Sequence, residues 1–582
     1  MGYRSALFLT VAMFVGFCSA AGQQGSAPHA VESWFVDSLV KVFPENTRPK
    51  DASTHGQAIA ARNGHSSIQL VLRSHRGMEN VSVSVEGLDS EKNPRVKVEV
   101  RPVGYVVVAA NTKDTSPSEL VHSAPGLFPD VLLEDSVLKL EPGKTQSIWL
   151  TFRVPPDAPA GSFAAKVVVR EKGKPILNLP LTLRIVAATV PSQRTLKVTN
   201  WFYLTDRQLK GFFGVKVLSE DWWHVLENFA RVMAEHRQNM IVTPLTGFYF
   251  SKLALIQARP GAAGLEYDFT NFDRWVDVFQ KAGVIGYIEG SHVVRHEDDS
   301  DDPTGANKVD VYILEDGMAV LKSLSTDDPR APQALFDMLS ALHRHLQEKG
   351  WLNIYYQHIL DEPGTEAMPM YLKYADLVHR AMPGVRTMDA VNARQDLSVY
   401  EKTCDVWVPV LESFDNLVDR LHEHQRRGGE VWYYTCLWPR GPYANRFIDF
   451  SLVKVRLLHW INFRYDLPGY LHWGGDYWSP DPVNETEPPI GDGASASMLP
   501  SGDAFIAYPD PAKKSILSSI RWEAMLEGIE DYELLRVLDQ RDPTTARGLA
   551  SKMVRTFTDY VRDPKEFRKL QVEMLEALSQ GQ

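Results

Sequence analysis

The segment Tyr355-Tyr356-Gln357-His358-Ile359-Leu360-Asp361-Glu362-Pro363 decides the fold. An apolar and aromatic run of this kind predicts a buried β-strand, and the proline stops it. Two carboxylates at the end of an apolar strand are costly unless they are solvated or used in chemistry. In a parallel α/β barrel, this position is the mouth of the active site. The alternative is a strand followed by a helix N-terminus, where Asp and Glu complement the helix dipole.

Strands and helices are predicted to alternate on both sides of this segment, from about residue 191 to 500. Helices are expected at 221–237, 272–281 and 331–348, among others. A (β/α)8 TIM barrel fits both the number of strands and the length of this region. The eight candidate strands are residues 198–202, 240–244, 285–289, 355–360, 386–389, 406–410, 431–435 and 469–473.

The regions that flank the barrel have other patterns. Residues 31–190 contain short strands with period-two alternation, such as Ile68–Leu72 and Val81–Val85, and few helical signals. They predict an all-β sandwich, for which a scaffold role is favoured over sugar binding. Residues 501–582 predict a short strand, Ala504–Tyr508, followed by helical sequence from Ser515 to the end. We expect a C-terminal helical appendage that closes or buttresses the barrel.

The first 21 residues have the features of a signal peptide. Arg4 precedes the apolar run Ala6–Phe17, and small residues follow it. We therefore expect export to the periplasm or the extracellular space. A lipid anchor at Cys18 is less favoured, because the bulky Phe17 fits a lipobox badly. No later apolar run reaches the ~20 residues that a span requires, so no membrane span is expected.

Composition restricts the partners and cofactors. The formal net charge of −11 argues against nucleic acid or an anionic membrane surface as partner. Cys404 and Cys436, which remain after the signal peptide, are expected to be buried free thiols. His292 and His296 with Glu297 do not follow the His-Glu-x-x-His pattern, and no third ligand has a recognisable spacing. We expect no metal and no cofactor.

Aromatic and polar side chains follow most of the predicted strands. Stacking recognises the apolar face of a sugar ring, and hydrogen bonds recognise its hydroxyls. Any one of these aromatic residues is more readily explained as core or rim, so their clustering is the evidence. Tyr203, Glu289 and Asp389 also lie at strand ends. With Asp361 and Glu362 as the catalytic pair, the substrate-binding candidates are Trp201, Tyr249, His292, Asn392, Tyr434, Trp438, Trp473, Asp476 and Trp478.

Two mechanisms of glycoside cleavage compete for the pair. An ordinary retaining enzyme places two carboxylates roughly 5–5.5 Å apart, and the second would be Glu412, or else Asp476. A substrate-assisted enzyme uses the 2-acetamido oxygen of the sugar as nucleophile, with one carboxylate to orient the acetamido N–H and a neighbouring acid. Adjacent residues suit the second case. Because successive strand residues point to opposite faces, Asp361 and Glu362 must then lie where the strand unwinds.

Several motifs resemble the family 123 glycoside hydrolases and their bacterial relatives. The resemblance spans roughly residues 191–536, and a preceding sandwich is usual in that family. The longest motif, Ser519–Glu533, is the most specific, and we expect it to be a charge-rich amphipathic helix with a structural role. The shared motifs are Leu360-Asp361-Glu362-Pro363, Gly469–Trp473 with Trp478, Gly502–Pro509 and Ser519–Glu533.

The resemblance implies an exo-acting, retaining β-N-acetylgalactosaminidase that works through an oxazoline intermediate. Glu362 would be the general acid and then the base, and Asp361 would hold the acetamido group. The partner would be a glycan or glycoconjugate with a terminal β-linked N-acetylhexosamine. Two alternatives stay open: a two-carboxylate retaining glycosidase that uses Glu362 with Glu412, and a catalytically silent glycan-binding surface protein.

Overall fold

The computed structural model describes residues 31–89, 95–204, 208–248, 253–262, 264–296, 307–391, 397–490 and 497–580. The predicted signal segment 1–21, Tyr249, Asn392 and Glu297 lie outside these residues.

Two five-stranded sheets form the N-terminal domain, as the alternating pattern predicted. Side chains such as Leu70, Leu150, Val169 and Leu183 fill the space between the sheets, and the intervening residues face outward. One sheet has the order β1 (Val31–Asp37), β3 (His65–Ser74), β8 (Thr145–Arg153), β5 (Lys97–Val108), β6 (Gly126–Leu132). The other has the order β2 (Gly56–Arg62), β10 (Lys174–Thr189), β9 (Gly161–Glu171), β4 (Met78–Glu86), β7 (Leu138–Leu140).

Parallel strands form the predicted barrel. β21 and β22 lie on either side of Trp432 in one segment of chain, and they pair with β20 and β23 respectively. The nine-stranded sheet therefore corresponds to eight segments that follow one another around a nearly closed ring. The strands are β11 (Lys197–Asn200), β12 (Met240–Thr243), β15 (Tyr287–Gly290), β18 (Tyr355–Gln357), β19 (Arg386–Ala390), β20 (Val406–Val408), β21 (Glu430–Val431), β22 (Tyr433–Tyr434) and β23 (Gly469–His472).

Helices lie between the strands and bury apolar side chains against the barrel. The predicted helix 331–348 has the same bounds as α4 (Ala331–Glu348), and the other two predictions agree within two residues. Ser219 begins α2 (Glu220–Glu235) by accepting a hydrogen bond from the Trp222 N–H. The remaining helices of this region are α3 (Thr270–Ala282), α5 (Met368–Ala381), α6 (Phe414–Arg426) and α7 (Leu452–Arg464), with the short turns η2 (Leu209–Phe213), η3 (Leu352–Ile354), η4 (Leu397–Tyr400) and η5 (Leu411–Ser413).

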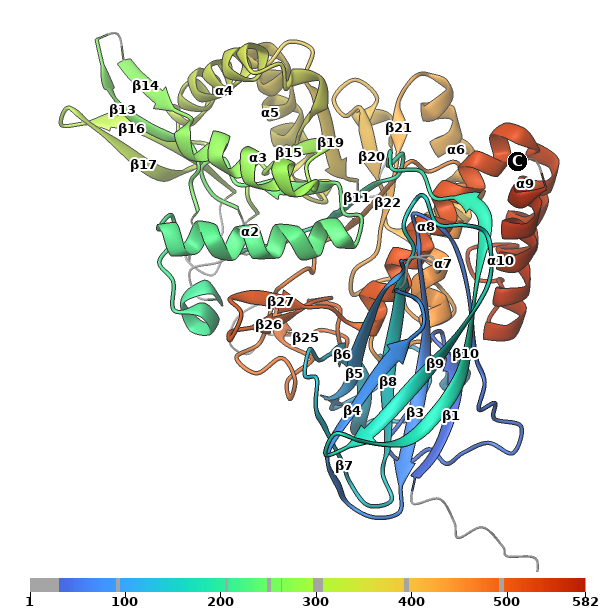
Figure 1. Cartoon of the computed structure of the whole chain (residues 1–582). Coiled ribbons are helices and arrows are strands. Elements are labelled where there is room, and N and C mark those ends of the chain that lie inside the picture. Colours follow the sequence, from blue (N-terminus) through green and yellow to red (C-terminus); the bar gives the residue numbers. More distant parts are fainter. Residues whose placement is uncertain are drawn as a thin grey trace, which may run out of the picture.

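Two hairpins extend the barrel on the side away from the sandwich (Figure 1). β13 (Gln257–Gly261) pairs with β14 (Gly264–Asp268), and β16 (Lys308–Glu315) pairs with β17 (Met318–Ser325). They follow β12 and β15, so they belong to connections that leave the C-terminal ends of barrel strands. Shorter pieces complete the chain: η1 (Pro117–Glu119), β24 (Pro489–Ile490) and β25 (Ser497–Met498).

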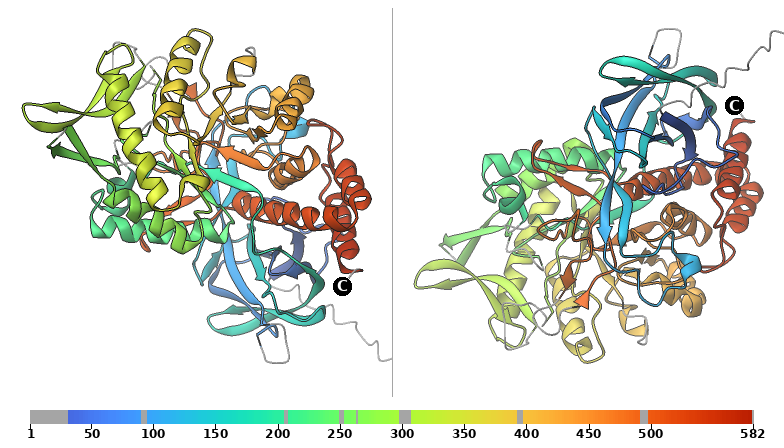
Figure 2. Two further views of the ribbon diagram at one scale, coloured as in Figure 1. Left: turned by 90° about the horizontal axis from the view of Figure 1, so that it is seen from above. Right: turned by 90° about the horizontal axis from the view of Figure 1, so that it is seen from below.

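The C-terminal region differs in part from the prediction. Residues 504–507 are buried without forming a strand, and a hairpin of β26 (Tyr508–Asp510) and β27 (Ser515–Leu517) follows them. Three helices then end the described chain: α8 (Ile520–Arg541), α9 (Pro543–Met553) and α10 (Pro564–Ser579). α8 runs between the sandwich and the barrel in both views of Figure 2.

Helix α8 is not amphipathic, which corrects the expectation for the Ser519–Glu533 motif. It is buried around its whole circumference from Ile520 to Leu535, because both domains and α7 cover it. Its charges are balanced by distant partners: Arg521 pairs with Asp130 of β6 at 2.8 Å, and Glu530 contacts His65 of β3 at 2.5 Å. The helix is structural, as expected, but it joins two domains instead of covering one.

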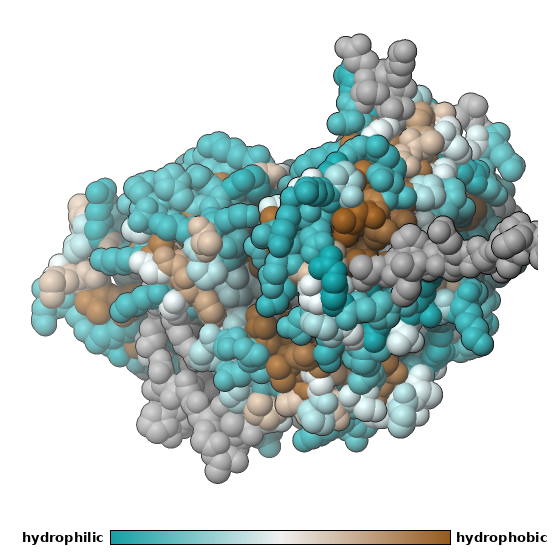
Figure 3. All heavy atoms as spheres, turned by 60° about the horizontal axis from the view of Figure 1, so that its bottom comes forward, coloured by the Kyte–Doolittle hydropathy of each residue, from teal (hydrophilic) through white to brown (hydrophobic). Residues whose placement is uncertain are grey.

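No helix among the described residues is both long and apolar enough to cross a membrane. On the face shown in Figure 3, hydrophilic side chains predominate and hydrophobic ones gather in separate patches. Cys404 and Cys436 are free thiols, the first buried and the second half-buried.

Candidate active site

The Asp361-Glu362 pair lies beyond the end of a barrel strand. The hydrogen-bonded ladder of β18 stops at Gln357, and both acids lie in a bend before Pro363. The prediction that the strand unwinds before the pair is therefore confirmed. Asp361 is half-buried and Glu362 is exposed. Freed from the alternation of a strand, the two neighbouring side chains can serve the same side of the barrel mouth.

The backbone at Glu362 is strained. Its φ of +42° lies in the left-handed region, which few residues other than glycine adopt. Such conformations cost of order 1–3 kcal/mol and cluster at functional sites. The Glu362 N–H donates to the Ala390 carbonyl of β19 at 3.0 Å, and a ring nitrogen of His296 contacts the Asp361 carbonyl. Strand β19 and the connection after β15 thus hold the turn in place.

Two tyrosines lie close to the carboxylates. The Tyr434 hydroxyl, at the end of β22, donates to Oε1 of Glu362. Burial, followed by the negative charge of Asp361, raises the pKa of Tyr203 well above its ordinary value. Tyr203 therefore keeps its phenolic proton across the physiological pH range, and both hydroxyls can serve as hydrogen-bond donors.

Aromatic rings form the floor of the barrel mouth around these groups. Tyr203 stacks on Phe248 with ring centroids 5.2 Å apart, and Trp201 meets Phe248 edge-on at 5.4 Å. Trp473 lies 6.4 Å from Tyr203 and 5.7 Å from Tyr477. Trp201, Tyr203 and Phe248 are buried, whereas Trp473 and Tyr477 are half-buried and so can present part of a ring to the apolar face of a sugar.

The ligand atoms of the buried residues His292, His358 and Asp389 lie within 4.8 Å of one another, a spacing that could hold a metal ion. Both ring nitrogens of His358 already contact carboxylates: Glu289 at 2.9 Å and Asp389 at 3.4 Å. The two imidazole rings are stacked, 4.3 Å apart and inclined by 29°. Because the lone pairs lie in the ring planes, they run side by side and do not converge on one ion. The arrangement fits a charged hydrogen-bond network better than a metal centre.

Two protein-family models match this chain. The model of the glycoside hydrolase 123 catalytic domain matches residues 201–538, more than half of the 582 residues, and the model of the glycoside hydrolase 123 N-terminal domain matches residues 40–171. The chain belongs to glycoside hydrolase family 123. It is therefore a glycoside hydrolase, and the resemblance inferred from its motifs is confirmed.

Solved structures were compared with this chain by their fold. A family 123 glycoside hydrolase from Clostridium perfringens, studied for glycolipid glycan hydrolysis, aligns over 95% of this chain and 97% of its own, with a TM-score of 0.71 and 16% sequence identity. A family 39 glycoside hydrolase from Bacteroides cellulosilyticus aligns over 81% of both chains, with a TM-score of 0.34 and 10% identity. No curated protein sequence is similar to this chain. The first match shows that both domains share the fold of a family 123 enzyme.

Three of the tryptophans predicted to bind substrate in this family 123 hydrolase lie at the barrel mouth or in its floor. The Trp201 Nε1–H donates to Oε1 of Glu289 at 2.7 Å, and its ring belongs to the floor. Trp473 is half-buried, and its Nε1–H donates to Asp503 at 3.2 Å. Trp438 is 39% exposed on the connection after β22, with the Arg440 guanidinium 4.2 Å from its ring. Of the three, Trp438 offers the most open ring face.

Asp476 and Trp478 are placed otherwise than we expected. Asp476 is fully buried, and its two carboxylate oxygens accept the N–H groups of Tyr203 and Leu204, at 2.7 and 3.3 Å. It thereby holds the chain after β11. The Trp478 ring packs against Phe212 outside the barrel, and its Nε1–H donates to a backbone carbonyl. Both positions follow from the turn after β23, which carries them away from the mouth.

The other predicted residues divide in a similar way. His292 is buried beneath the floor, stacked on His358. Glu412 lies in η5. Burial, the contact with Asp415 and, last, the charge of Glu412 raise the pKa of the Tyr443 hydroxyl. Phe248 and Asp503 line the region but were not predicted. Asp503 lies in the Gly502–Pro509 motif, which could have pointed to it. Nothing in the sequence pointed to Phe248, because it lies in a connection without periodicity.

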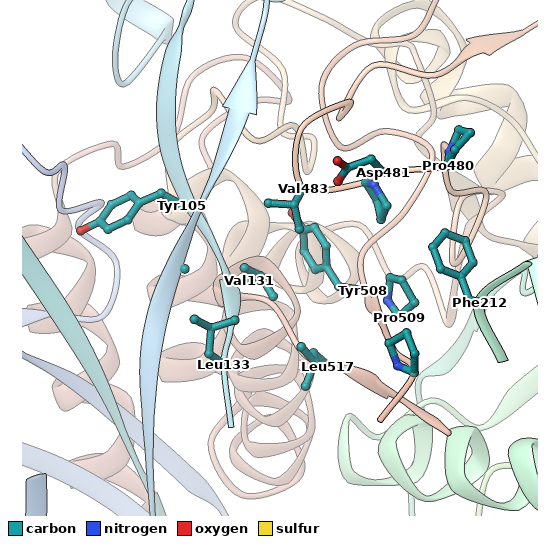
Figure 4. A pocket seen from close by; sticks show the side chains of 13 residues that line it. Tyr105, Val131, Leu133, Phe212, Pro480, Asp481, Val483, Tyr508, Pro509 and Leu517 are labelled. Carbon is teal, nitrogen blue, oxygen red and sulfur yellow. The ribbon is translucent and has the colours of Figure 1, made fainter. Parts of the chain in front are cut away.

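A separate pocket of about 360 Å³ lies at the junction of the sandwich and the barrel (Figure 4). Val131 and Leu133 line it from the sandwich, Phe212 from η2, and Tyr508 and Pro509 from β26. Among the described residues, Asp481 is the one acid that lines it, so they offer no pair of carboxylates. The glycosidase site is therefore better placed at the barrel mouth.

Proposed function

We propose that this family 123 enzyme is an exo-acting, retaining β-N-acetylgalactosaminidase that uses the acetamido group of its substrate as nucleophile. The observation that carries the proposal is the adjacency of Asp361 and Glu362 in the strained bend after β18. The glycosidic oxygen and the 2-acetamido group occupy neighbouring positions of the sugar ring. Neighbouring residues can therefore serve both positions. A conventional retaining site needs two carboxylates on opposite sides of the scissile bond, so it gives no reason for two adjacent acids.

In the first step, Glu362 gives its proton to the glycosidic oxygen while the acetamido oxygen attacks C1 from the opposite face. The C1–oxygen bond to the aglycone breaks, and an oxazolinium ion forms. Asp361 accepts the hydrogen bond of the acetamido N–H and stabilises the positive charge that develops there. In the second step, Glu362 takes a proton from water, the water oxygen attacks C1, and the oxazolinium ring opens with the original configuration.

The proposed substrate is a glycan or glycoconjugate with a terminal β-linked N-acetylhexosamine. Trp473 is half-buried and Trp438 is 39% exposed, so these two rings can offer faces to a sugar. The preference for the galacto configuration follows from the family resemblance. Since the relative from Clostridium perfringens was studied for glycolipid glycan hydrolysis, glycolipid glycans are the first natural substrates to test. We also propose that the chain is exported, which N-terminal sequencing of the mature protein would test.

A two-carboxylate mechanism would need Glu412 to face Glu362 across the scissile bond. Glu412 lies in η5, directly before α6, where the neighbouring acid Asp415 accepts the Tyr443 hydroxyl. An acid at this place is explained by the N-terminus of α6, without a role in binding sugar. A silent glycan-binding protein would have no need for a strained bend that carries two acids.

The decisive experiment compares p-nitrophenyl β-GalNAc, β-GlcNAc and β-galactoside as substrates of the wild type, Glu362→Gln and Asp361→Asn. We expect cleavage of acetamido sugars only, inhibition by an N-acetylgalactosamine thiazoline, and loss of on the order of 10²–10⁴ in kcat for each variant. Equal turnover of the β-galactoside, or indifference to the thiazoline, would refute substrate assistance. Azide rescue of a Glu412→Gly variant would favour the two-carboxylate alternative, and binding without turnover would favour the silent one.

A further inference from the structure

Three side chains from successive strands meet beneath the Asp361-Glu362 turn. Glu289 comes from β15, His358 follows β18 and Asp389 comes from β19, and all three are fully buried. His358 Nε2 lies 2.9 Å from Glu289 Oε1, and Nδ1 lies 3.4 Å from Asp389 Oδ1. We propose that Glu289, His358 and Asp389 form a positioning triad that sets the geometry of the Asp361-Glu362 turn. The inference rests on the proposed function in that this pair performs the chemistry.

The charge balance explains why a histidine stands between the two carboxylates. Burial opposes the charged imidazole, but the hydrogen bonds and charges of Asp389 and Glu289 outweigh it and raise the pKa of His358 to about 9. An imidazolium donates from both nitrogens, so one ring can hold two strands at once. The other groups facing it are the stacked ring of His292 and the edge of Trp201. Neither offers a competing carboxylate.

Asp389 supports the turn directly. Its Oδ1 accepts the Ile359 N–H at 2.9 Å, at a point where the β18–β19 ladder has already ended. A side chain therefore takes the place of the backbone acceptor that a regular strand would supply. The next residue of β19, Ala390, accepts the Glu362 N–H at 3.0 Å. β19 thus binds the segment Ile359–Glu362 at both of its ends, and the chain turns between these two hydrogen bonds to reach the φ of +42° at Glu362.

Glu289 links the same turn to the aromatic floor of the barrel mouth. Its Oε1 accepts the Trp201 Nε1–H at 2.7 Å as well as the contact with His358, and its Oε2 accepts the Thr199 hydroxyl at 2.6 Å. The position of the Trp201 ring and the position of the catalytic turn are therefore fixed by one carboxylate. Fully connected buried networks of this kind rigidify a site, whereas half-satisfied ones disorder it.

The test uses the full mature protein with Asp389→Asn and Glu289→Gln, which keep side-chain shape and remove charge. A misplacement of about 1 Å costs on the order of 10²-fold, so we expect kcat to fall roughly 100-fold in both variants. KM should stay within about twofold in Asp389→Asn, whereas it should rise in Glu289→Gln, because Glu289 also holds Trp201. Tyr371→Phe removes a bond to the other oxygen of Asp389, at 2.9 Å, and should cost far less. Glu530→Gln, in the distant pair with His65, should lower stability and leave kcat unchanged. A kcat within threefold of wild type for both triad variants would overturn the inference.

Two measurements do not depend on turnover, so they separate this inference from failure of the proposed function. ¹⁵N NMR of labelled histidines, assigned with His358→Gln, should show His358 protonated on both nitrogens at pH 7.5. Crystal structures of Asp389→Asn and Glu289→Gln should show the Asp361-Glu362 backbone displaced. A neutral His358 at that pH, or an unmoved turn in both variants, would refute the triad even if the wild type cleaves no N-acetylhexosaminide.

Discussion

The Tyr434 hydroxyl donates a hydrogen bond to Oε1 of Glu362 from a barrel segment three positions around the ring. The bond fixes one oxygen of an otherwise exposed carboxylate and so limits the rotation of the whole carboxyl group. A hydrogen bond to a charged group contributes about 1.5–3 kcal/mol. Because Glu362 is the proposed general acid, this contact bears on the rate more than on the stability.

Tyr434→Phe should lower kcat about tenfold or more, because Glu362 loses the donor that orients it. Steady-state kinetics on an aryl glycoside will measure the change. Tyr433→Phe is the matched control, since the Tyr433 hydroxyl donates to the Leu458 carbonyl on the opposite side of the segment, at 2.6 Å. The control should lose stability but keep its kcat. An equal fall in both variants would speak against an orienting contact.

Glu412→Gln should retain kcat within about threefold, whereas Glu362→Gln should lose on the order of 10²–10⁴, the usual contribution of a general acid. The reason is the position of Glu412 in η5, directly before the first turn of α6. Both variants remove one charge and keep the size of the side chain. A loss in Glu412→Gln as large as that in Glu362→Gln would revive the two-carboxylate mechanism.

Asp130→Asn should destabilise the protein by about 3–5 kcal/mol, because it leaves the Arg521 cation buried without its partner. Both side chains are fully buried at the contact between β6 and α8, 2.8 Å apart. Urea unfolding followed by tryptophan fluorescence will report the change. Asp559→Asn, in the exposed pair with Arg555, is the control and should leave the midpoint where it is. If Asp130→Asn behaves like the control, α8 does not join the domains through this pair.

Asp476→Asn should become more stable relative to wild type as the pH rises from about 4 to 7. Burial raises the pKa of Asp476 to about 7 in the folded protein, against 3.8 for the ordinary group. Between these values the folded state holds a proton that the unfolded state has released, so wild-type stability falls by up to about 1.4 kcal/mol per pH unit. The amide introduced by the substitution does not ionise, so the variant escapes this loss. Parallel curves of unfolding free energy against pH for the two proteins would contradict a raised pKa of Asp476 in the folded state.

Local patterns predicted the regular elements well. The apolar spacing of residues 331–348 defines α4 to the residue, and the eight predicted strands are the eight segments of the ring. Helices and barrel strands bury their side chains on faces that follow from a fixed period, so the period can be read along the chain. The prediction was weaker wherever a segment is covered on all sides, as in α8, because burial then has no period.

The candidate site was predictable only where a residue follows a strand directly. Asp361 and Glu362 could be placed because the strand before them is strongly apolar and Pro363 marks its end. Asp476 and Trp478 follow a strand too, but a turn after β23 directs the first to backbone N–H groups and the second to the outside of the barrel. The path of that turn decides which side chains face a ligand.

By itself, the sequence determined the strands of the sandwich, the alternating strands and helices of the barrel, the family and the adjacency of the two acids, since each depends on neighbours along the chain. Only the tertiary structure decided which distant groups act on those acids. Tyr434 reaches Glu362 across 72 positions of sequence, and Asp389 reaches Ile359 across 30. Hydrogen bonds depend on distance in space, and the closure of the barrel, which no local pattern encodes, brings these atoms together.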